Sequence, residues 1–437
     1  MTATWPPAPP PVVPPERLPP QTAPPRIKVL HVITRLAGGS GGNVLLSAAG
    51  MDPRVYEVWI AGSAGGPLWR GADDKGLRTA QLPRLREVVS PVGDLITLWQ
   101  LIRLMRRERF SVVHTHSSKG GVLGRLAARW CRVPVVVHTF HAFSFHAFMR
   151  SSRRRWYLFL ERLVRGTTHA FVAVAPQVAR EAVEHRLAPP GSVRVVPSSV
   201  DIEGVPQTAR SSARSELGLD GDGPIVGTVG RLVFQKAPLD FVRMAALVAQ
   251  RHSDARFVWV GDASFNGSLE GASLEERTRE EARRLGVDVR FTGFREDAPA
   301  LTACFDVFVI TSLYEGLGRA LTEALAAARP VVATAVNGVP DLVEPGSTGL
   351  LTPPSDPRSM ADCVSWLLEH PDEARRMGRA GRHRVLGTFR PEVMCEELDR
   401  VYRDLLGLPR ARPTREVPFV EAPMVRRERK GMIRHAG

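Results

Sequence analysis

The chain has 437 residues and a mass of 48.0 kDa, which favours two domains, each large enough to bury its own core. Its composition, 43% hydrophobic and 24% charged, is that of a globular protein. The longest apolar stretches reach only about ten residues, short of the ~20 that a membrane-spanning helix needs. The net charge of +14 calls for an acidic partner: phosphate groups, anionic lipid or nucleic acid.

The compartment is predicted from the start of the chain and from the cysteines. The first residues show neither the basic segment nor the apolar segment of a secretory signal. The four cysteines have no CxxC or metal-ligand spacing, which is typical of a reduced protein: Cys131, Cys304, Cys363 and Cys395. We therefore expect a cytoplasmic location.

Short strand patterns dominate the chain after a proline-rich start. Residues 1–25 contain eleven prolines and little core material, so we predict a disordered tail there. Apolar strands then alternate with helical patterns at 27–33, 55–61, 111–115, 133–139 and 169–174. After a linker around 201–208 the alternation restarts, with strands at 224–230, 257–260, 289–291, 307–310 and 331–333. This pattern indicates an α/β fold with two doubly wound parallel sheets.

The predicted domains follow from this alternation. An N-terminal Rossmann-like domain is expected over 26–205 and a C-terminal one over 206–388. The helical pattern continues to residue 406, and the basic segment 408–437 is expected to be poorly ordered. Ligands of such sheets bind beyond the carboxyl ends of the strands, so the loops there are the candidate site.

A glycine cluster, Gly38–Gly42, lies between the first strand and an apolar helical run. Glycines let a backbone approach a ligand, and a helix N-terminus offers free N–H groups to an anion. The spacing is neither GxGxxG nor a Walker loop, and a merely flexible loop is the alternative.

Two cations follow the opening strand of the second half. Arg231 and Lys236 lie where a diphosphate would meet a forked guanidinium and a mobile ammonium. The chain has only five lysines, which gives Lys236 more weight than another arginine would have. Solvated surface charges are the alternative.

Glu315 and Glu323 straddle a strand-to-helix junction in the segment 312–323. We expect them on nearly one helical face, about 12 Å apart, too far for a glycosidase pair. That distance suits the two ends of a nucleotide sugar, with ribose at Glu323 and the sugar at Glu315. An ordinary acidic helix start is the alternative.

Taken together, these motifs resemble the retaining glycosyltransferases of family 4, the group 1 type with the GT-B fold. The resemblance spans roughly residues 27–406 and includes Asn337–Asp341 followed by Gly346–Leu350. It implies two sheets facing across a cleft, with a C-terminal helix at 389–407 crossing back to the first domain. It also implies catalytic roles for Glu315, His116, Lys236 and Arg231, and further donor contacts at Gly38, Gly39, Gly316, Leu317, Glu323 and Val339. Two positions depart from the family pattern: Asp341 replaces a common glutamate, and Ser40–Gly42 replaces Ala-Gln-Glu.

Histidines end two strands of the first half, in His114-Thr115-His116 and His138-Thr139-Phe140-His141. His114 and His116 share a face because strand side chains alternate. The resemblance gives His116 a contact to the donor sugar, with His141 a second candidate; Lys119 and His141 are acceptor-side candidates. Structural histidines, at least at His114 and His138, and a zinc site are the alternatives.

Two other segments carry hypotheses of their own. The turn Asp220–Gly223 resembles a metal-binding DxD motif but is interpreted as a turn, and no required metal or cofactor is expected. The segment 148–163 interleaves arginines with Trp, Tyr and Phe, which favours an anionic membrane surface or a lipid-linked acceptor over nucleic acid. A partly buried helix with a basic outer face is the alternative.

The sequence therefore predicts a retaining, metal-independent glycosyltransferase that uses a UDP- or GDP-sugar and a glycan or lipid-linked acceptor. It is expected in the cytoplasm, with peripheral contact to the membrane. A nucleotide-sugar epimerase on the same fold is one rival hypothesis, and a protein that binds anionic surfaces or nucleic acid is another.

Overall fold

The computed structural model describes residues 25–143, 145, 148–201, 210–219, 222–263 and 269–410, without the side chains of 210–213 and 269–272. Apart from their inner ends, the predicted tails 1–25 and 408–437 lie outside these residues. So do most of the linker and the first half of the Asp220–Gly223 turn. Among the helices in the described part of the chain, none combines the length and apolarity needed to cross a membrane.

The first sheet has seven parallel strands in the order β3-β2-β1-β4-β5-β6-β7. The strands are β1 Ile27–Val32, β2 Tyr56–Ser63, β3 Arg78–Leu82, β4 Val112–His116, β5 Val135–Phe140, β6 Ala170–Ala173 and β7 Val193–Val195. Val29 of the interior strand β1 pairs with Val58 on one side and Val112 on the other. Both faces of this sheet are covered, which explains the continuous apolar runs in the sequence.

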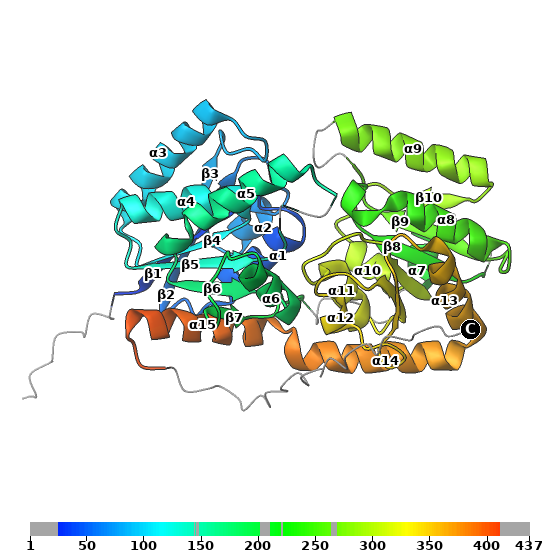
Figure 1. Ribbon diagram of the computed structural model, residues 1–437. Helices are drawn as coiled ribbons and strands as arrows, with labels where there is room; N and C mark the ends of the chain where they lie inside the picture. Colours follow the sequence, from blue (N-terminus) through cyan, green and yellow to red (C-terminus); the bar gives the residue numbers. More distant parts are fainter. Residues whose placement is uncertain are drawn as a thin grey trace, which may run out of the picture.

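Helices lie on both faces of the first sheet. One face is covered by α1 Gly38–Gly50, α2 Trp69–Asp74 and the C-terminal helix α15 Pro391–Leu406. The other is covered by α3 Pro91–Glu108, α4 Ser118–Trp130 and α5 Ser151–Leu163, with α6 Pro176–Glu184 following β6. Residues Met394, Leu398 and Val401 of α15 recur at helical spacing and are buried against this sheet. The expected return of the C-terminal helix to the first domain is confirmed (Figure 1).

The second sheet has six parallel strands in the order β10-β9-β8-β11-β12-β13. The strands are β8 Ile225–Val229, β9 Arg256–Val260, β10 Val289–Phe291, β11 Val307–Ile310, β12 Val331–Thr334 and β13 Leu350–Thr352. Its helices are α7 Arg210–Leu217, α8 Pro238–Ala249, α9 Leu269–Leu285, α10 Ala298–Thr302, α11 Arg319–Ala326, α12 Val339–Leu342, α13 Pro357–Glu369 and α14 Pro371–Thr388. The described residues also contain two short 3₁₀ turns: η1 Arg165–Thr167 before β6 in the first domain, and η2 Phe234–Lys236 after β8 in the second.

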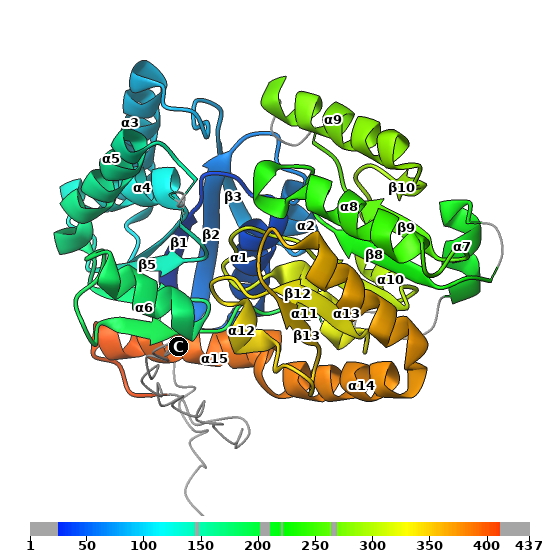
Figure 2. The same cartoon turned by 45° about the vertical axis from the view of Figure 1, so that its right-hand side comes forward.

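The helical pattern at the C-terminus is divided by proline. The helical pattern predicted up to residue 406 consists of three helices, α13, α14 and α15. Pro371 and Pro391 each lie in the first turn of a helix, where the missing N–H costs nothing. The break before α15 lets the chain pass from the second domain to the first (Figure 2).

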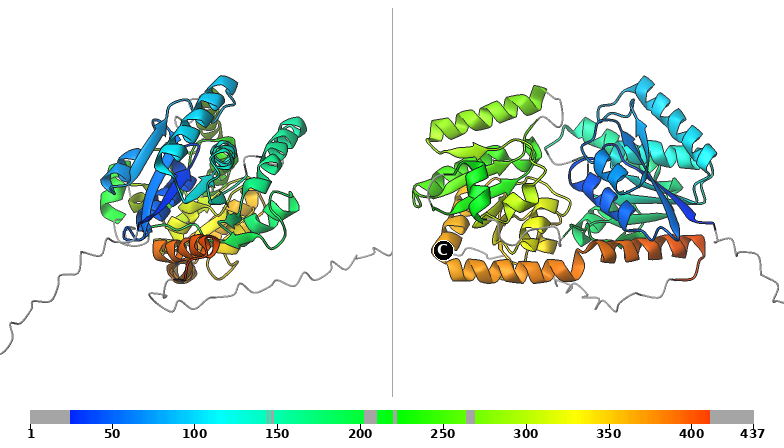
Figure 3. Two further views of the ribbon diagram at one scale, coloured as in Figure 1. Left: turned by 90° about the vertical axis from the view of Figure 1, so that its left-hand side faces the viewer. Right: turned by 180° about the vertical axis from the view of Figure 1, so that it is seen from behind.

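The two sheets form separate domains that lie side by side (Figure 1 and the right panel of Figure 3). A shared hydrophobic cluster joins them, with Phe140 and Ala175 from the first domain and Leu317 and Val339 from the second. The predicted fold of two doubly wound parallel sheets is confirmed.

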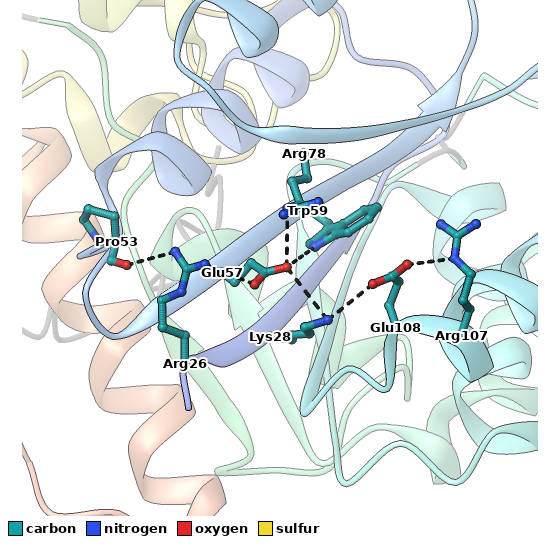
Figure 4. A network of polar contacts seen from close by, with 8 residues as sticks. All are labelled: Arg26, Lys28, Pro53, Glu57, Trp59, Arg78, Arg107 and Glu108. Carbon is teal, nitrogen blue, oxygen red and sulfur yellow. Dashed lines mark hydrogen bonds and ion pairs between the residues drawn. The ribbon is translucent and has the colours of Figure 1, made fainter. Parts of the chain in front are cut away.

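A polar network lies at the amino ends of the first strands (Figure 4). Glu57 accepts from the Trp59 indole at 3.0 Å and from Arg26 at 3.3 Å, and Lys28 donates to Glu108 at 3.3 Å. This edge is opposite to the carboxyl ends of the strands. We therefore assign the network to structure and not to ligand binding.

Candidate active site

The carboxyl ends of the two sheets meet through very close backbone contacts. A Cβ on Gly316 would lie 1.7 Å from the carbonyl oxygen of His141. A Cβ on Gly338 would lie 2.9 Å from the Cβ of Ala175, and its N–H donates to the carbonyl of Gly316 at 3.0 Å. Only glycine permits this approach, so the loops after β11 and β12 touch the first domain.

Leu317 and Val339, two of the predicted donor contacts, have buried side chains. Leu317 is 5% exposed and Val339 is 0% exposed, and both belong to the cluster that joins the domains. Ligand contact at Val339 is therefore limited to its backbone.

The predicted glycine loop forms the first turn of a helix. α1 begins at Gly38, which has a φ of +60° and no atom within 4 Å of the position of a Cβ. Gly39 and Gly42 face Arg319 of α11: a Cβ on Gly42 would lie 2.0 Å from the Nη1 atom of Arg319. The glycines thus form a notch that holds an arginine from the other domain.

Arg319 was not singled out by the sequence analysis, although it lies inside the Glu-x7-Glu motif. Its Nε donates to Glu323 Oε1 at 2.8 Å, and its Nη1 is buried without a hydrogen-bond partner among the described residues. The left-handed Gly318 before it, with a φ of +92°, marks the start of α11 and is the signal that could have drawn attention to it.

Lys236 and Glu315 form an ion pair at the interface edge of the second sheet. Glu315 Oε1 accepts from Lys236 Nζ and from Ser312 Oγ, the latter at 2.8 Å, and the Glu315 side chain is 8% exposed. The N–H of Glu315 donates to Asn337 Oδ1 at 2.9 Å. Lys236 and Glu315, which were predicted from two separate motifs, therefore lie together in one hydrogen-bonded group.

The expectation that Glu315 and Glu323 share one helical face was wrong. Helix α11 begins only at Arg319, so Glu315 lies in the preceding loop and Glu323 within the helix. Each carboxylate has a separate cation, Lys236 for Glu315 and Arg319 for Glu323.

Arg231 is exposed just beyond β8, and it lies close enough to Tyr314 for its charge to affect the pKa of the Tyr314 hydroxyl. Burial raises the pKa of the Tyr314 hydroxyl, and the charge of Arg231 partly opposes that shift. Tyr314 is joined to the Lys236 turn because its carbonyl accepts from Gln235 Nε2 at 2.9 Å. Arg231, Lys236 and Glu315 thus belong to adjoining loops of one sheet edge.

The loop 337–341 is bound to α6 of the first domain. Asn337 Nδ2 donates to Glu181 Oε1 at 2.8 Å, and Asp341 Oδ2 accepts from the N–H of Gln177 at 2.8 Å. The shorter Asp341, a departure from the family pattern, fits this bond to the start of the helix. Sequence reasoning missed these contacts because the partners are 156 and 164 residues apart.

Five histidines, His31, His114, His116, His138 and His141, form a buried cluster at the ends of β1, β4 and β5. His116 is the centre of a chain: its Nε2 lies 3.0 Å from His31 Nδ1, and its Nδ1 lies 2.9 Å from His141 Nε2. His114 and His138 are hydrogen-bonded to other groups, as the structural alternative predicted. The sequence analysis did not single out His31.

Burial keeps this histidine cluster neutral. It lowers the pKa of His31 to about 3 and that of His141 to about 4, with His141 adding a repulsive charge effect at His31. The other three have pKa values well below 6.5, again mainly because of burial. Because both ring nitrogens of His116 are hydrogen-bonded, a bond from His116 to a sugar requires it to give up one of these partners. His141 is less buried and adjoins Gly316.

The hydrogen bonds also bear on the zinc hypothesis. His31, His114 and His116 have ligand atoms within 4.8 Å of one another. However, both nitrogens of His114 are taken, Nδ1 by the Tyr402 hydroxyl and Nε2 by Thr139 Oγ1, each at 2.6 Å. A metal would have to displace most of these bonds, so the donor set does not fit a zinc site.

Lys119, an acceptor-side candidate, is held at the start of α4. Its Nζ lies 2.6 Å from Asp94 Oδ1 and donates to the carbonyl of Val88 at 2.5 Å. Asp94 is in the first turn of α3 and Val88 is in the loop before it, so Lys119 joins the starts of α3 and α4 at the carboxyl edge of the first sheet.

Two models of known protein families match this chain. Residues 37–203 match the model described as Glycosyltransferase Family 4, and residues 223–370 match the one described as Glycosyl transferases group 1. The chain belongs to these glycosyltransferases. A D-inositol 3-phosphate glycosyltransferase of Thermobispora bispora is 30% identical over 316 residues, which cover 68% of this chain and 72% of the relative.

Two further similarities cover almost the whole folded chain. The UDP-Gal:alpha-D-GlcNAc-diphosphoundecaprenol alpha-1,3-galactosyltransferase of Escherichia coli is 28% identical over 387 residues, or 87% of this chain and 98% of the relative. Anabaena HepE, solved in complex with UDP-glucose, has a TM-score of 0.74 at 19% identity, covering 87% of this chain and all of HepE. The likeness to HepE establishes that this glycosyltransferase has the GT-B fold.

Proposed function

We propose that this glycosyltransferase moves a sugar from a UDP- or GDP-sugar to an acceptor, with retention at the anomeric carbon and without a metal ion. The observation that carries the proposal is the pair formed by Lys236 and Glu315, placed where the two domains touch. Arg231 and Lys236 bind the diphosphate, Glu315 binds hydroxyls of the donor sugar, and Glu323 binds the ribose.

The chemistry required is stabilisation of the departing diphosphate. Fixed cations and the N–H groups at Gly38 and Gly39 do this electrostatically. Glu315 is already hydrogen-bonded by Lys236 and Ser312, which makes it an anchor and a poor nucleophile. Transfer on the same face of the sugar is therefore preferred over a covalent glycosyl-enzyme.

The proposed acceptor is a glycan on a lipid carrier at the cytoplasmic face of a membrane. The Escherichia coli relative is named for a diphosphoundecaprenol-linked acceptor and matches over 98% of its length. The four cysteines are all unpaired, as expected in a reducing compartment. Lys119 and His141 lie on the first-domain side of the contact, where the acceptor would enter.

A two-stage experiment tests this function. A thermal-shift screen of nucleotide sugars identifies the donor, and transfer of labelled sugar to a polyprenyl-diphosphate-linked acceptor is then measured in detergent. NMR of the product determines whether the anomeric configuration is retained. We expect Lys236→Met to lower turnover by more than about a hundredfold, the scale for losing a charge that stabilises the transition state. We expect Glu323→Gln to weaken binding of the donor, because it removes the acceptor for the ribose hydroxyls. The matched control is Lys75→Met, because Lys75 is an exposed lysine that ends α2 and belongs to none of these loops.

Three results would contradict the proposal. Donor consumed without sugar transfer would indicate an epimerase or hydrolase. Full activity in Glu323→Gln would contradict the role of Glu323 in binding the ribose. Loss of turnover in EDTA that is restored only by added metal would contradict a metal-independent mechanism.

A further inference from the structure

Helix α3 exposes an apolar stripe that the fold does not use. Val92, Leu95 and Trp99 are 71%, 67% and 58% exposed, and Ile96 is 38% exposed between them. These positions follow the i, i+3, i+4, i+7 spacing of one helical face. The exposed Val88 and Val89, at 77% and 60%, extend the stripe into the loop before the helix.

The same helix buries a different face against the sheet. Gly93, Thr97, Leu101 and Met105 are its buried residues and follow their own helical spacing. The outer stripe therefore contributes nothing to the core. A contiguous exposed apolar patch of this kind marks an interaction site in a soluble domain.

A second stripe lies on α5, on the same side of the first sheet. Trp156, Phe159 and Leu163 are 53%, 53% and 62% exposed, and the two aromatic rings stack at 5.7 Å. Helix α4 packs against both α3 and α5 (Figure 2). We call the two stripes together the α3–α5 surface.

The α3–α5 surface begins at the mouth of the candidate active site. A helix that follows a parallel strand starts at the carboxyl edge of the sheet, and the Lys119 contacts place the start of α3 there. Just before α5, the ring of Phe148 lies 5.5 Å from that of Phe234, which is in the same short turn as Lys236.

Arginines surround the apolar residues. Arg103 and Arg106 continue the outer stripe of α3, and the Arg103 guanidinium lies 5.5 Å from the Trp99 ring. Exposed arginines also flank the stripe of α5: Arg150, Arg153, Arg155 and Arg162. The one acid within α5, Glu161, is buried and paired with Arg125, so it does not offset this charge.

We propose that the α3–α5 surface docks the enzyme onto an anionic phospholipid bilayer, with Trp99, Leu95 and Trp156 at the level of the head groups. Aliphatic and aromatic side chains ringed by arginine fit that partner. Two copies of this chain joined about a two-fold axis would set these arginines against one another. A nucleic-acid partner would not account for the exposed Val, Leu and Ile side chains. This inference deepens the proposed function by placing its acceptor side against the membrane.

The test is co-sedimentation of the full-length protein with phosphatidylcholine vesicles that contain phosphatidylglycerol or lack it, with no donor present. Leu95→Ser/Trp99→Ser is expected to lower the vesicle partition coefficient at least tenfold, since both side chains are exposed and serve no core contact. Arg103→Gln/Arg106→Gln is expected to lower it about fivefold per arginine at low salt, and less at high salt. Trp130→Ser is the matched control, because Trp130 is 67% exposed but ends α4 at the opposite edge.

The inference is overturned if Leu95→Ser/Trp99→Ser binds vesicles like the wild type, or if Trp130→Ser weakens binding equally. It is also overturned if the wild type does not bind vesicles and Leu95→Ser/Trp99→Ser changes the oligomeric mass measured by light scattering. That result would make this surface a contact between copies of the chain. Turnover of a short water-soluble acceptor without vesicles should be equal in wild type and variants. If even the wild type shows none, the proposed function fails while the vesicle result stands by itself.

Discussion

Replacing Lys236 by methionine separates the binding role of this lysine from its role in stability. Methionine keeps the length of the side chain but removes the charge that faces Glu315. The two side chains are only 19% and 8% exposed, so the change leaves a largely buried carboxylate with Ser312 as its remaining side-chain donor. Breaking a fully buried pair costs about 3–5 kcal/mol, and the partial exposure of Lys236 reduces our expectation to roughly 1–3 kcal/mol.

The assay combines urea denaturation with steady-state kinetics. Lys236→Met should lose this stability and also lose turnover with the nucleotide sugar. The double variant Lys236→Met/Glu315→Gln removes the unpaired charge, so it should recover most of the stability and none of the turnover. Recovery of turnover in the double variant, or a single variant as stable as the wild type, would refute the reasoning.

Three further predictions concern the framework of the first domain. Tyr402→Phe removes the hydroxyl 2.6 Å from His114 Nδ1, so the free energy of unfolding should fall by about 1–2 kcal/mol in urea titrations, and an unchanged midpoint would contradict it. Arg125→Met leaves Glu161, which is 4% exposed, buried without its cation; we expect a loss of about 3–5 kcal/mol, largely restored by adding Glu161→Leu. The histidine cluster has folded-state pKa values far below 6.5, about 3 and about 4 at two positions, so the unfolded chain takes up more protons as the pH falls. The free energy of unfolding should therefore fall by about 1.4 kcal/mol per pH unit for His31 and for His141 between pH 6.5 and 4, and a flat pH profile would contradict this.

Local pattern was sufficient for the interior strands of both sheets and for the order of the motifs. It missed the edge strands β3, β7 and β13, which are short and only partly buried and so lack a continuous apolar run. The predicted strands are short apolar runs bounded by polar loops. Lys236 follows the opening strand of the second sheet, and the rarity of lysine in this chain marked it as a candidate site residue. The position of α11 was less predictable, because the helix starts at the left-handed Gly318 and not at Glu315. A single glycine changed which residues are helical, and the shared face that we expected disappeared.

Contacts between distant segments could not be predicted. Arg319 reaches the glycines of α1 only after both domains have folded and come together. The bond from Asn337 to Glu181 likewise joins segments that show no common period in the sequence. The exposed stripe of α3 has ordinary helical spacing, and only the structure shows that this apolar face is the one turned away from the core.

The ion pairs of the candidate site bear on its choice of ligand. In the structure Lys236 is paired with Glu315, and Arg319 with Glu323, so an anion that draws either cation away from its partner leaves a carboxylate behind. A free phosphate accepts hydrogen bonds from the cation but gives nothing to the carboxylate. Its binding therefore leaves the carboxylate unpaired, which costs free energy. In the proposed binding mode, a nucleotide sugar presents a diphosphate to the cations and hydroxyls to both carboxylates, so it replaces each partner that it displaces. Selectivity for the whole donor over its phosphate part then follows from the cost of leaving a buried charge unpaired.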